Sequence, residues 1–144
     1  MTRDELKAQL RKYTDLKAER AQLLREIKRI EDIMAAPKGA SLDGMPRSPG
    51  AGDPVLQTVT QHLVLLERYQ AQEAKLAAAQ TEIEDMIESL DSLERRIMRH
   101  RYLEGLTWEE VCVAICYSWR QTHNIHARAL DQLLALQEGE DNAG

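Results

Sequence analysis

The sequence predicts an all-α protein, with a long helical hairpin or coiled coil followed by three shorter helices. Its 144 residues include 30% Asp, Glu, Lys and Arg and only 4% aromatic residues, a profile typical of long amphipathic helices. Two stretches with apolar residues at helical spacing flank a segment that holds all four prolines and four of the seven glycines. Beyond residue 90, closely spaced helix-start signals indicate short helices separated by tight turns.

The first ninety residues form the hairpin or coiled-coil region, residues 1–90. In the first helix, apolar residues recur every seven positions and Arg20 interrupts them; the series is Leu6, Tyr13, Ile27 and Met34. A Gly/Pro linker at 36–54 ends that helix, and a second apolar stripe runs from Val59 to Leu90, interrupted by Glu73 and Gln80. Neither helix can bury its stripe alone. An antiparallel hairpin within one chain is favoured, and a parallel dimer through the first helix stays open.

Residues 91–137 carry three helix starts. Asp91 with Glu94 and Thr107 with Glu110 have the spacing of capping boxes, and Ser118 is positioned to cap the last helix. A first helix to about residue 103, a short second helix and a longer third helix after a three-residue turn form a trihelical helix-turn-helix. Residues 138–144 lack a large apolar residue and are predicted to be a disordered tail.

Composition and charge exclude some classes of function and favour others. No apolar run approaches the ~18 residues of a membrane span, so no membrane contact is expected. The two cysteines cannot make a disulfide framework, which favours a reducing, cytoplasmic location. The net charge is −5, but residues 95–128 contain six arginines and three acids. Such asymmetry indicates a nucleic-acid-binding face.

The C-terminal motif resembles a known family. Arg101-Tyr-Leu-Glu-Gly-Leu-Thr-Trp-Glu-Glu-Val, then Tyr117-Ser and Ile125-His-Ala-Arg-Ala-Leu, is similar to the region 4 helix-turn-helix of bacterial sigma factors. It resembles more closely the sigma-region-4-like regulators of Gram-positive phages and prophages, some of which activate late genes. The resemblance implies a sequence-specific transcriptional regulator, phage- or prophage-encoded, whose helix after Ser118 enters the major groove of double-stranded DNA.

The resemblance also implies the residues that contact DNA. Arg120 is placed to bind guanine, and Gln121 or Asn124 to bind adenine. Thr107 lies where a helix N-terminus meets a phosphate. The further candidates are Trp119, His123, Arg128 and Arg101. If His123 and His126 lie near phosphate, binding should strengthen as the pH falls through about 6.5. A homodimer is expected, and RNA polymerase is a candidate partner.

Two alternatives belong to other classes. Positions 119, 121 and 123 hold Trp, Gln and His where sigma factors usually have arginine, and the whole chain is acidic. These features suit a protein-interaction module that binds RNA polymerase or a sigma factor without DNA affinity. The DNA-binding small subunit of a phage terminase also combines a helix-turn-helix with oligomerising helices.

Catalysis, cofactors and metals find no support in the sequence. The acids near residue 85 lie along one helix as a solvated face, and the glycines lack the spacing of a phosphate-binding loop. Cys112, Cys116, His123 and His126 could supply four zinc ligands, but the His-x2-His spacing is tighter than zinc sites use. The chain is therefore predicted not to be an enzyme, with no cofactor and no metal.

Overall fold

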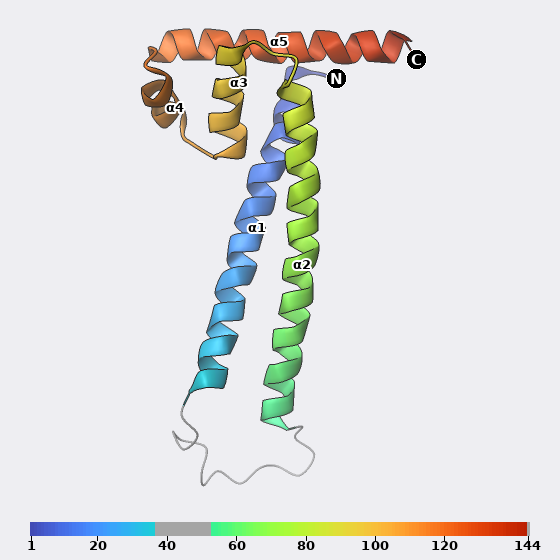
Figure 1. Cartoon of the computed structure of the whole chain (residues 1–144), viewed down its shortest axis with the longest axis vertical. Helices are drawn as coiled ribbons and strands as arrows, with labels where there is room; N and C mark the ends of the chain where they lie inside the picture. Colours follow the sequence, from blue (N-terminus) through green and yellow to red (C-terminus); the bar gives the residue numbers. More distant parts are fainter. Residues whose placement is uncertain (37–52, 144) are drawn as a thin grey trace. The chain divides into compact units, whose positions relative to one another are not determined.

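The computed structural model describes residues 1–36 and 53–143, and all of its regular elements are helices (Figure 1). The long helices are α1 (Arg3–Ala35) and α2 (Pro54–Ile87). They are followed by α3 (Ser92–Met98), the π-helical segment η1 (Arg99–Leu103), α4 (Trp108–Ile115) and α5 (Trp119–Ala143). The predicted all-α class is confirmed. Within the described residues, no helix combines the length and apolarity needed to cross a membrane.

The chain divides into two compact units. We call Met1–Lys17 with Lys75–Gly144 the terminal unit, and Ala18–Ala74 the hairpin unit. This division differs from the boundary expected after residue 90, because the start of α1 belongs to the same core as α5. Leu6 and Leu10 are fully buried in one cluster with Leu130 and Leu133. The predicted linker, 36–54, lies almost wholly outside the described residues, although Pro54 already begins α2.

Three helices begin where the sequence places their caps. The Thr2 hydroxyl accepts a hydrogen bond from the Glu5 amide at 3.2 Å, and the Asp91 carboxylate accepts one from the Glu94 amide at 2.9 Å. At α4, Thr107 and Glu110 form a complete capping box. Each cap satisfies amide groups that have no partner within the helix, so these starts are fixed by local sequence.

The helix expected over 91–103 changes its winding halfway. After Met98 the chain continues as η1, where the Glu104 amide donates to the Arg99 carbonyl at 2.9 Å. Gly105 follows with φ +75°, a backbone conformation that favours glycine, and ends the segment. The wider turn leads into the loop before α4, where the Arg101 guanidinium donates to the Leu106 carbonyl at 2.9 Å.

Two apolar clusters build the terminal unit. The larger joins the start of α1, the end of α2, α3, η1 and α5, and includes Ile87, Met98 and Tyr102. The smaller holds α4 in place and consists of Ile97, Val111, Ile115 and Ile125, with Leu93, Leu106 and Trp108 packed against it. The tail expected to be disordered from residue 138 is instead helical as far as Ala143, because no proline interrupts α5 and its only glycine, Gly139, does not end it.

In the hairpin unit, polar pairs join α1 and α2. The Gln72 amide donates to Glu19 at 2.8 Å, Arg20 lies 3.3 Å from Glu73, and His62 lies 3.1 Å from Glu31. The two pairs near residue 20 of α1 involve residues 72 and 73 of α2, whereas Glu31, further along α1, pairs with the earlier His62, so these segments are antiparallel within one chain. Arg20 and Glu73, which interrupt the two apolar stripes in the sequence, form an ion pair with each other.

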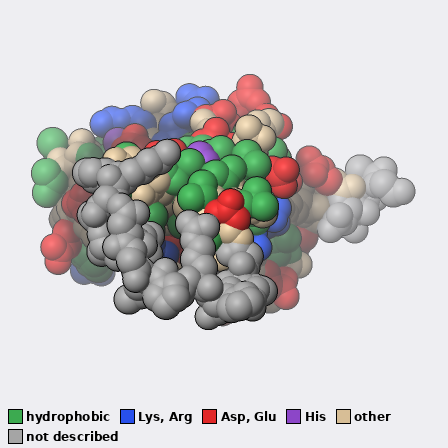
Figure 2. Space-filling model, turned by 90° about the horizontal axis from the view of Figure 1, so that it is seen from below, with side chains coloured by type: hydrophobic (Ala, Val, Ile, Leu, Met, Phe, Trp, Pro, Cys, Tyr) green, Lys and Arg blue, Asp and Glu red, His purple; other side chains and the backbone are tan. Residues whose placement is uncertain are grey.

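The hairpin unit also leaves apolar side chains in solvent. Figure 2 shows a group of hydrophobic side chains on this face, with acidic side chains at its margin. The exposed apolar side chains of this unit are Leu24, Ile33, Met34, Val55, Leu56, Leu63 and Val64. Two helices have too little surface between them to bury these residues, because each helix covers only one side of the other.

Candidate nucleic-acid interface

The turn between α4 and α5 is tight. Cys116 has φ 61° and ψ 38°, the left-handed conformation, and its amide donates to the Val113 carbonyl at 3.2 Å. The Tyr117 amide donates to the Cys112 carbonyl at 3.2 Å and closes the end of α4. Glycine adopts this left-handed conformation without strain, whereas a residue with a Cβ such as Cys116 does not.

Replacing Cys116 by glycine is expected to raise the free energy of unfolding by up to about 1 kcal/mol. The left-handed conformation costs a residue with a Cβ about 1 kcal/mol, whereas glycine adopts it without this cost. Chemical denaturation at neutral pH measures the change. Cys116→Ala, which keeps a Cβ, is the control and should show no gain; an equal gain in both variants would contradict the strain argument.

α5 begins at once after this turn. The Gln121 amide donates to the Ser118 hydroxyl at 3.2 Å, and the Ser118 amide donates back to the Gln121 side-chain oxygen at 3.2 Å. This reciprocal pair is a capping box with glutamine in place of glutamate. The predicted cap at Ser118 is confirmed, and the first turn of α5 stands at the surface.

One side of α5 holds it against the rest of the terminal unit. Thr122 and Ala129 are fully buried and Ile125 is 8% exposed. Ile125 packs in the smaller cluster with Val111 and Ile115 of α4, and Ala129 lies in the larger one. Since both clusters contact it, the first half of α5 is fixed in position and presents a constant outer side.

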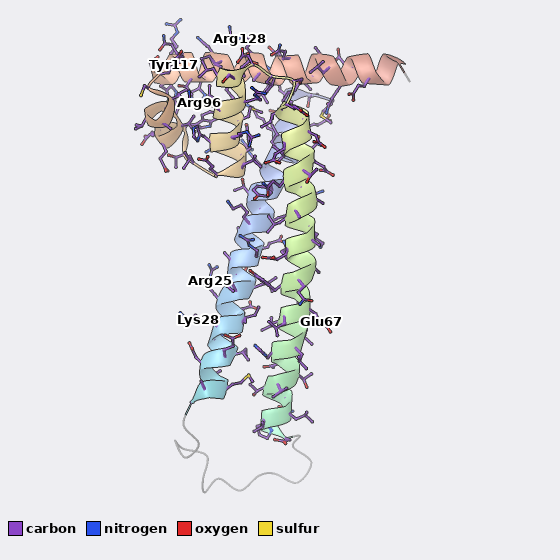
Figure 3. The ribbon with its side chains drawn as sticks, in the orientation of Figure 1. Arg25, Lys28, Glu67, Arg96, Tyr117 and Arg128 are labelled. Carbon is purple, nitrogen blue, oxygen red and sulfur yellow. The ribbon has the colours of Figure 1, made fainter. Side chains whose placement is uncertain are left out.

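The outer side carries the polar residues that the sequence singled out. Arg120, Asn124 and Arg128 are exposed and follow one another at four-residue intervals, so they form one stripe along α5. Gln121 is exposed beside them, but its side-chain oxygen is used in the cap, which leaves its NH2 group to donate. We call these four residues the α5 stripe; Figure 3 labels Arg128 within it.

Arg128 has a partner in α3. Its Nε lies 3.5 Å from Glu94 Oε1, and the Glu94 side chain is 4% exposed while that of Arg128 is 67% exposed. Burial and the nearby Asp91 raise the pKa of Glu94, and the Arg128 charge opposes this. The other oxygen of Glu94 has no hydrogen-bond partner among the described residues. Part of the Arg128 charge is therefore compensated within the protein.

Apolar side chains border the α5 stripe at the turn. Trp119 is 54% exposed, Val113 is 77% exposed and Tyr117, labelled in Figure 3, is 41% exposed. We call these three residues the turn patch. Trp119, a candidate DNA contact from the sequence, is therefore accessible to a partner. An exposed tryptophan next to other apolar groups is typical of a contact surface.

Three candidate contact residues are instead engaged in the protein's own packing. His123 lies between the rings of Trp108 and Trp119, with centroid distances of 4.6 and 4.4 Å. The Arg101 guanidinium lies 4.9 Å over the Trp108 ring. Thr107 bonds the carboxylate of Glu110 through its hydroxyl at 3.0 Å, so an acid already occupies the helix start where a phosphate was expected.

His126 does not face outward either. It is 5% exposed, and its Nε2 lies 2.7 Å from the Tyr102 hydroxyl. Burial, with a smaller effect of Lys7, lowers the pKa of His126 to about 3, and burial also lowers the pKa of His123. The His126 ring therefore stays neutral near pH 6.5, and the lowered pKa of His123 favours its neutral form, so neither shift supports a strengthening of DNA binding as the pH falls through about 6.5.

No sequence pattern predicted the cluster of Arg101, Trp108, His123 and His126. These residues are separated by up to 25 positions and follow no spacing rule, and only the packing of η1 and α4 on α5 brings them together. Over the described residues, no three His, Cys, Asp or Glu side chains lie close enough to hold a metal ion. The Cys112 and Cys116 thiols are free.

Comparison of the chain with protein-family models, with curated proteins and with solved structures finds no match.

Proposed function

We propose that this chain is a helix-turn-helix DNA-binding protein that reads the major groove with the α5 stripe. More particularly, we propose a cytoplasmic transcriptional regulator of the sigma-region-4-like class, encoded by a phage or prophage. The observation that carries the proposal is the α5 stripe itself: two arginines, an asparagine and a glutamine amide, all exposed on the outer side of a helix held rigidly from behind.

The chemistry of the α5 stripe suits base recognition. Arginine donates two parallel hydrogen bonds to guanine O6 and N7, and asparagine pairs in the same way with adenine N6 and N7. A capped helix start following a three-residue turn allows the first turns of α5 to enter a groove about 12 Å wide. Arg120 and Asn124 lie in those first turns, and Arg128, one turn further, is the candidate contact to the phosphate backbone.

The proposal is tested by DNA-binding assays on the full chain. The wild-type protein would be used to select duplexes from a random pool, and the affinity for a selected duplex would be measured by fluorescence anisotropy. Arg120→Ala and Asn124→Ala should each weaken binding roughly tenfold, because a bidentate contact contributes about 1–3 kcal/mol of discrimination. Arg25→Ala, which removes an exposed arginine of α1 in the hairpin unit, is the matched control and should bind like wild type.

Two outcomes would reject the proposal: no duplex enriched over the random pool, or wild-type affinity retained by both α5 variants. With one arginine partly compensated by Glu94, a single copy offers few phosphate contacts, and its affinity should fall with salt less steeply than that of strongly basic proteins. A homodimer doubles these contacts. The exposed apolar residues of the hairpin unit support self-association, and the anisotropy titration gives the number of chains per duplex.

The turn patch favours a second candidate, a protein-interaction module. Val113, Tyr117 and Trp119 expose apolar surface at the same turn, which suits contact with RNA polymerase or a sigma factor. Pull-down of polymerase by the wild-type chain, lost in Trp119→Ala and accompanied by no DNA affinity, would support this candidate. For a terminase small subunit, light scattering should instead detect ring-sized oligomers.

A further inference from the structure

The terminal unit contains a small cavity on the inner side of α5. Its volume is about 80 Å³, and the lining residues that matter here are Lys7, Arg11, Arg101, Trp108, His123 and His126. A water molecule occupies about 30 Å³ of liquid, so the cavity is of the size of a small polyatomic ion rather than of a nucleoside. All of its lining residues belong to the terminal unit.

Three cationic side chains meet at this cavity. Lys7 and Arg11 are one turn apart on α1 and therefore point the same way, and Arg101 comes from η1. No Asp or Glu lines the cavity, and none of the salt bridges in the described part of the chain involves these three residues. Their positive charge acts on the His123 ring, because burial and then the charges of Arg101 and Lys7 lower the pKa of His123.

One of the residues that line the cavity also has a polar atom without a partner. His123 Nε2 is shielded from solvent and has no hydrogen-bond partner among the described residues. The rings of Trp108 and Trp119 fix the imidazole, so it cannot turn freely to solvent. The neighbouring His126 differs, because the Tyr102 hydroxyl satisfies its Nε2. Buried polar groups are rarely left unsatisfied, and a shielded imidazole nitrogen among cations suits an anionic partner.

We propose that this cavity binds a phosphate group, with Lys7, Arg11 and Arg101 neutralising its charge and His123 donating a hydrogen bond. Four oxygens in a tetrahedral arrangement accept bonds from several directions, which matches donors arriving from α1, η1 and α5. Arginine and lysine together are the residues that phosphate recognition most often uses. The site does not depend on DNA binding, because His123 and His126 lie on a different side of α5 from Arg120, Asn124 and Arg128.

The test measures the binding of inorganic phosphate to the full chain by isothermal titration calorimetry, in a buffer that holds ionic strength constant with sodium chloride. Wild type should bind phosphate, while Lys7→Met and Arg11→Met should each lose about tenfold in affinity, the effect of one charge-assisted hydrogen bond. Lys12→Met is the matched control, since Lys12 is an exposed cation of the same helix that does not line the cavity. It should bind like wild type.

A second measurement uses the wild-type protein and does not depend on the stability of any variant. The ring nitrogens of His123 are followed by NMR during the titration; added phosphate should move the Nε2 resonance, and chloride should not. A nucleoside 5′-monophosphate titrated in parallel distinguishes a phosphate ester from the free ion by which of the two binds more tightly. The proposal would be overturned if phosphate produced no more heat and no larger shift of the His123 resonance than chloride. It would also be overturned if Lys7→Met and Lys12→Met lost phosphate affinity equally.

Discussion

Replacing Leu10 by alanine is expected to lower the free energy of unfolding of the terminal unit by about 2–5 kcal/mol. Leu10 is fully buried and packs in the cluster that also contains Ile87, Leu130 and Leu133. Removing its side chain loses the transfer free energy of three carbons and leaves a cavity that the surrounding helices cannot fill completely. Urea denaturation, followed by the circular dichroism of the helices, measures the change.

Leu24→Ala provides the control on the same helix. Leu24 is 53% exposed, so its truncation removes little buried area and should cost less than about 0.5 kcal/mol. A loss below 1 kcal/mol for Leu10→Ala, or equal losses in the two variants, would contradict the placement of the start of α1 in the core of the terminal unit.

The second large effect is a loss of stability in acid that originates at His126. Burial, followed by the charges of Lys7 and other cations, lowers the pKa of His126 from 6.5 to about 3 in the folded protein. The unfolded chain takes up a proton below pH 6.5, and the folded protein does not until about pH 3. Protonation of the unfolded chain therefore lowers the free energy of unfolding as the pH falls below 6.5. The loss relative to neutral pH is about 2 kcal/mol at pH 5 and grows until about pH 3.

The variant His126→Gln isolates this effect, because glutamine can still bond the Tyr102 hydroxyl but does not titrate. Denaturation between pH 4.5 and 7 should show a flatter dependence of the free energy of unfolding in the variant than in wild type. The difference in slope between the two proteins is the relevant quantity, because other groups also change stability with pH. The lowered pKa of His123 also destabilises the fold as the pH falls, whereas the raised pKa of Glu94 stabilises it. Identical slopes would show that His126 is accessible to protons in the folded protein.

Local signals in the sequence predicted the elements well, because caps and turns are decided by neighbouring residues. Ser118 with Gln121 and Thr107 with Glu110 lie three positions apart, and each pair satisfies its own helix start. Arg20 and Glu73 interrupt two regular stripes and pair with each other, which the pattern alone did not indicate. The wider π-helical winding at η1 was not predicted; its buried Tyr102 packs against residues that lie far away in the chain, such as Leu6 and Leu130.

The candidate site was only partly predictable. Arg120, Asn124 and Arg128 were named as DNA contacts through the family resemblance, and all three are exposed at four-residue intervals along α5. Spacing could not show that Arg101 and His123 would be drawn inward, because this depends on the two tryptophan rings that come to lie beside them from α4 and α5. The partner of Arg128 was missed for the same reason: Glu94 reaches it through the contact of α3 with α5.

The core of the terminal unit joins segments that lie far apart in the sequence, and this affects how the core forms during synthesis. Leu6 and Leu10 are synthesised long before Leu130 and Leu133, yet they need these residues to complete their packing. At about 5–20 residues per second, roughly 6–24 s pass between the synthesis of the two groups. Throughout that interval Leu6 and Leu10 of the nascent chain lack the partners that bury them, so this part of the core closes only after α5 has been made.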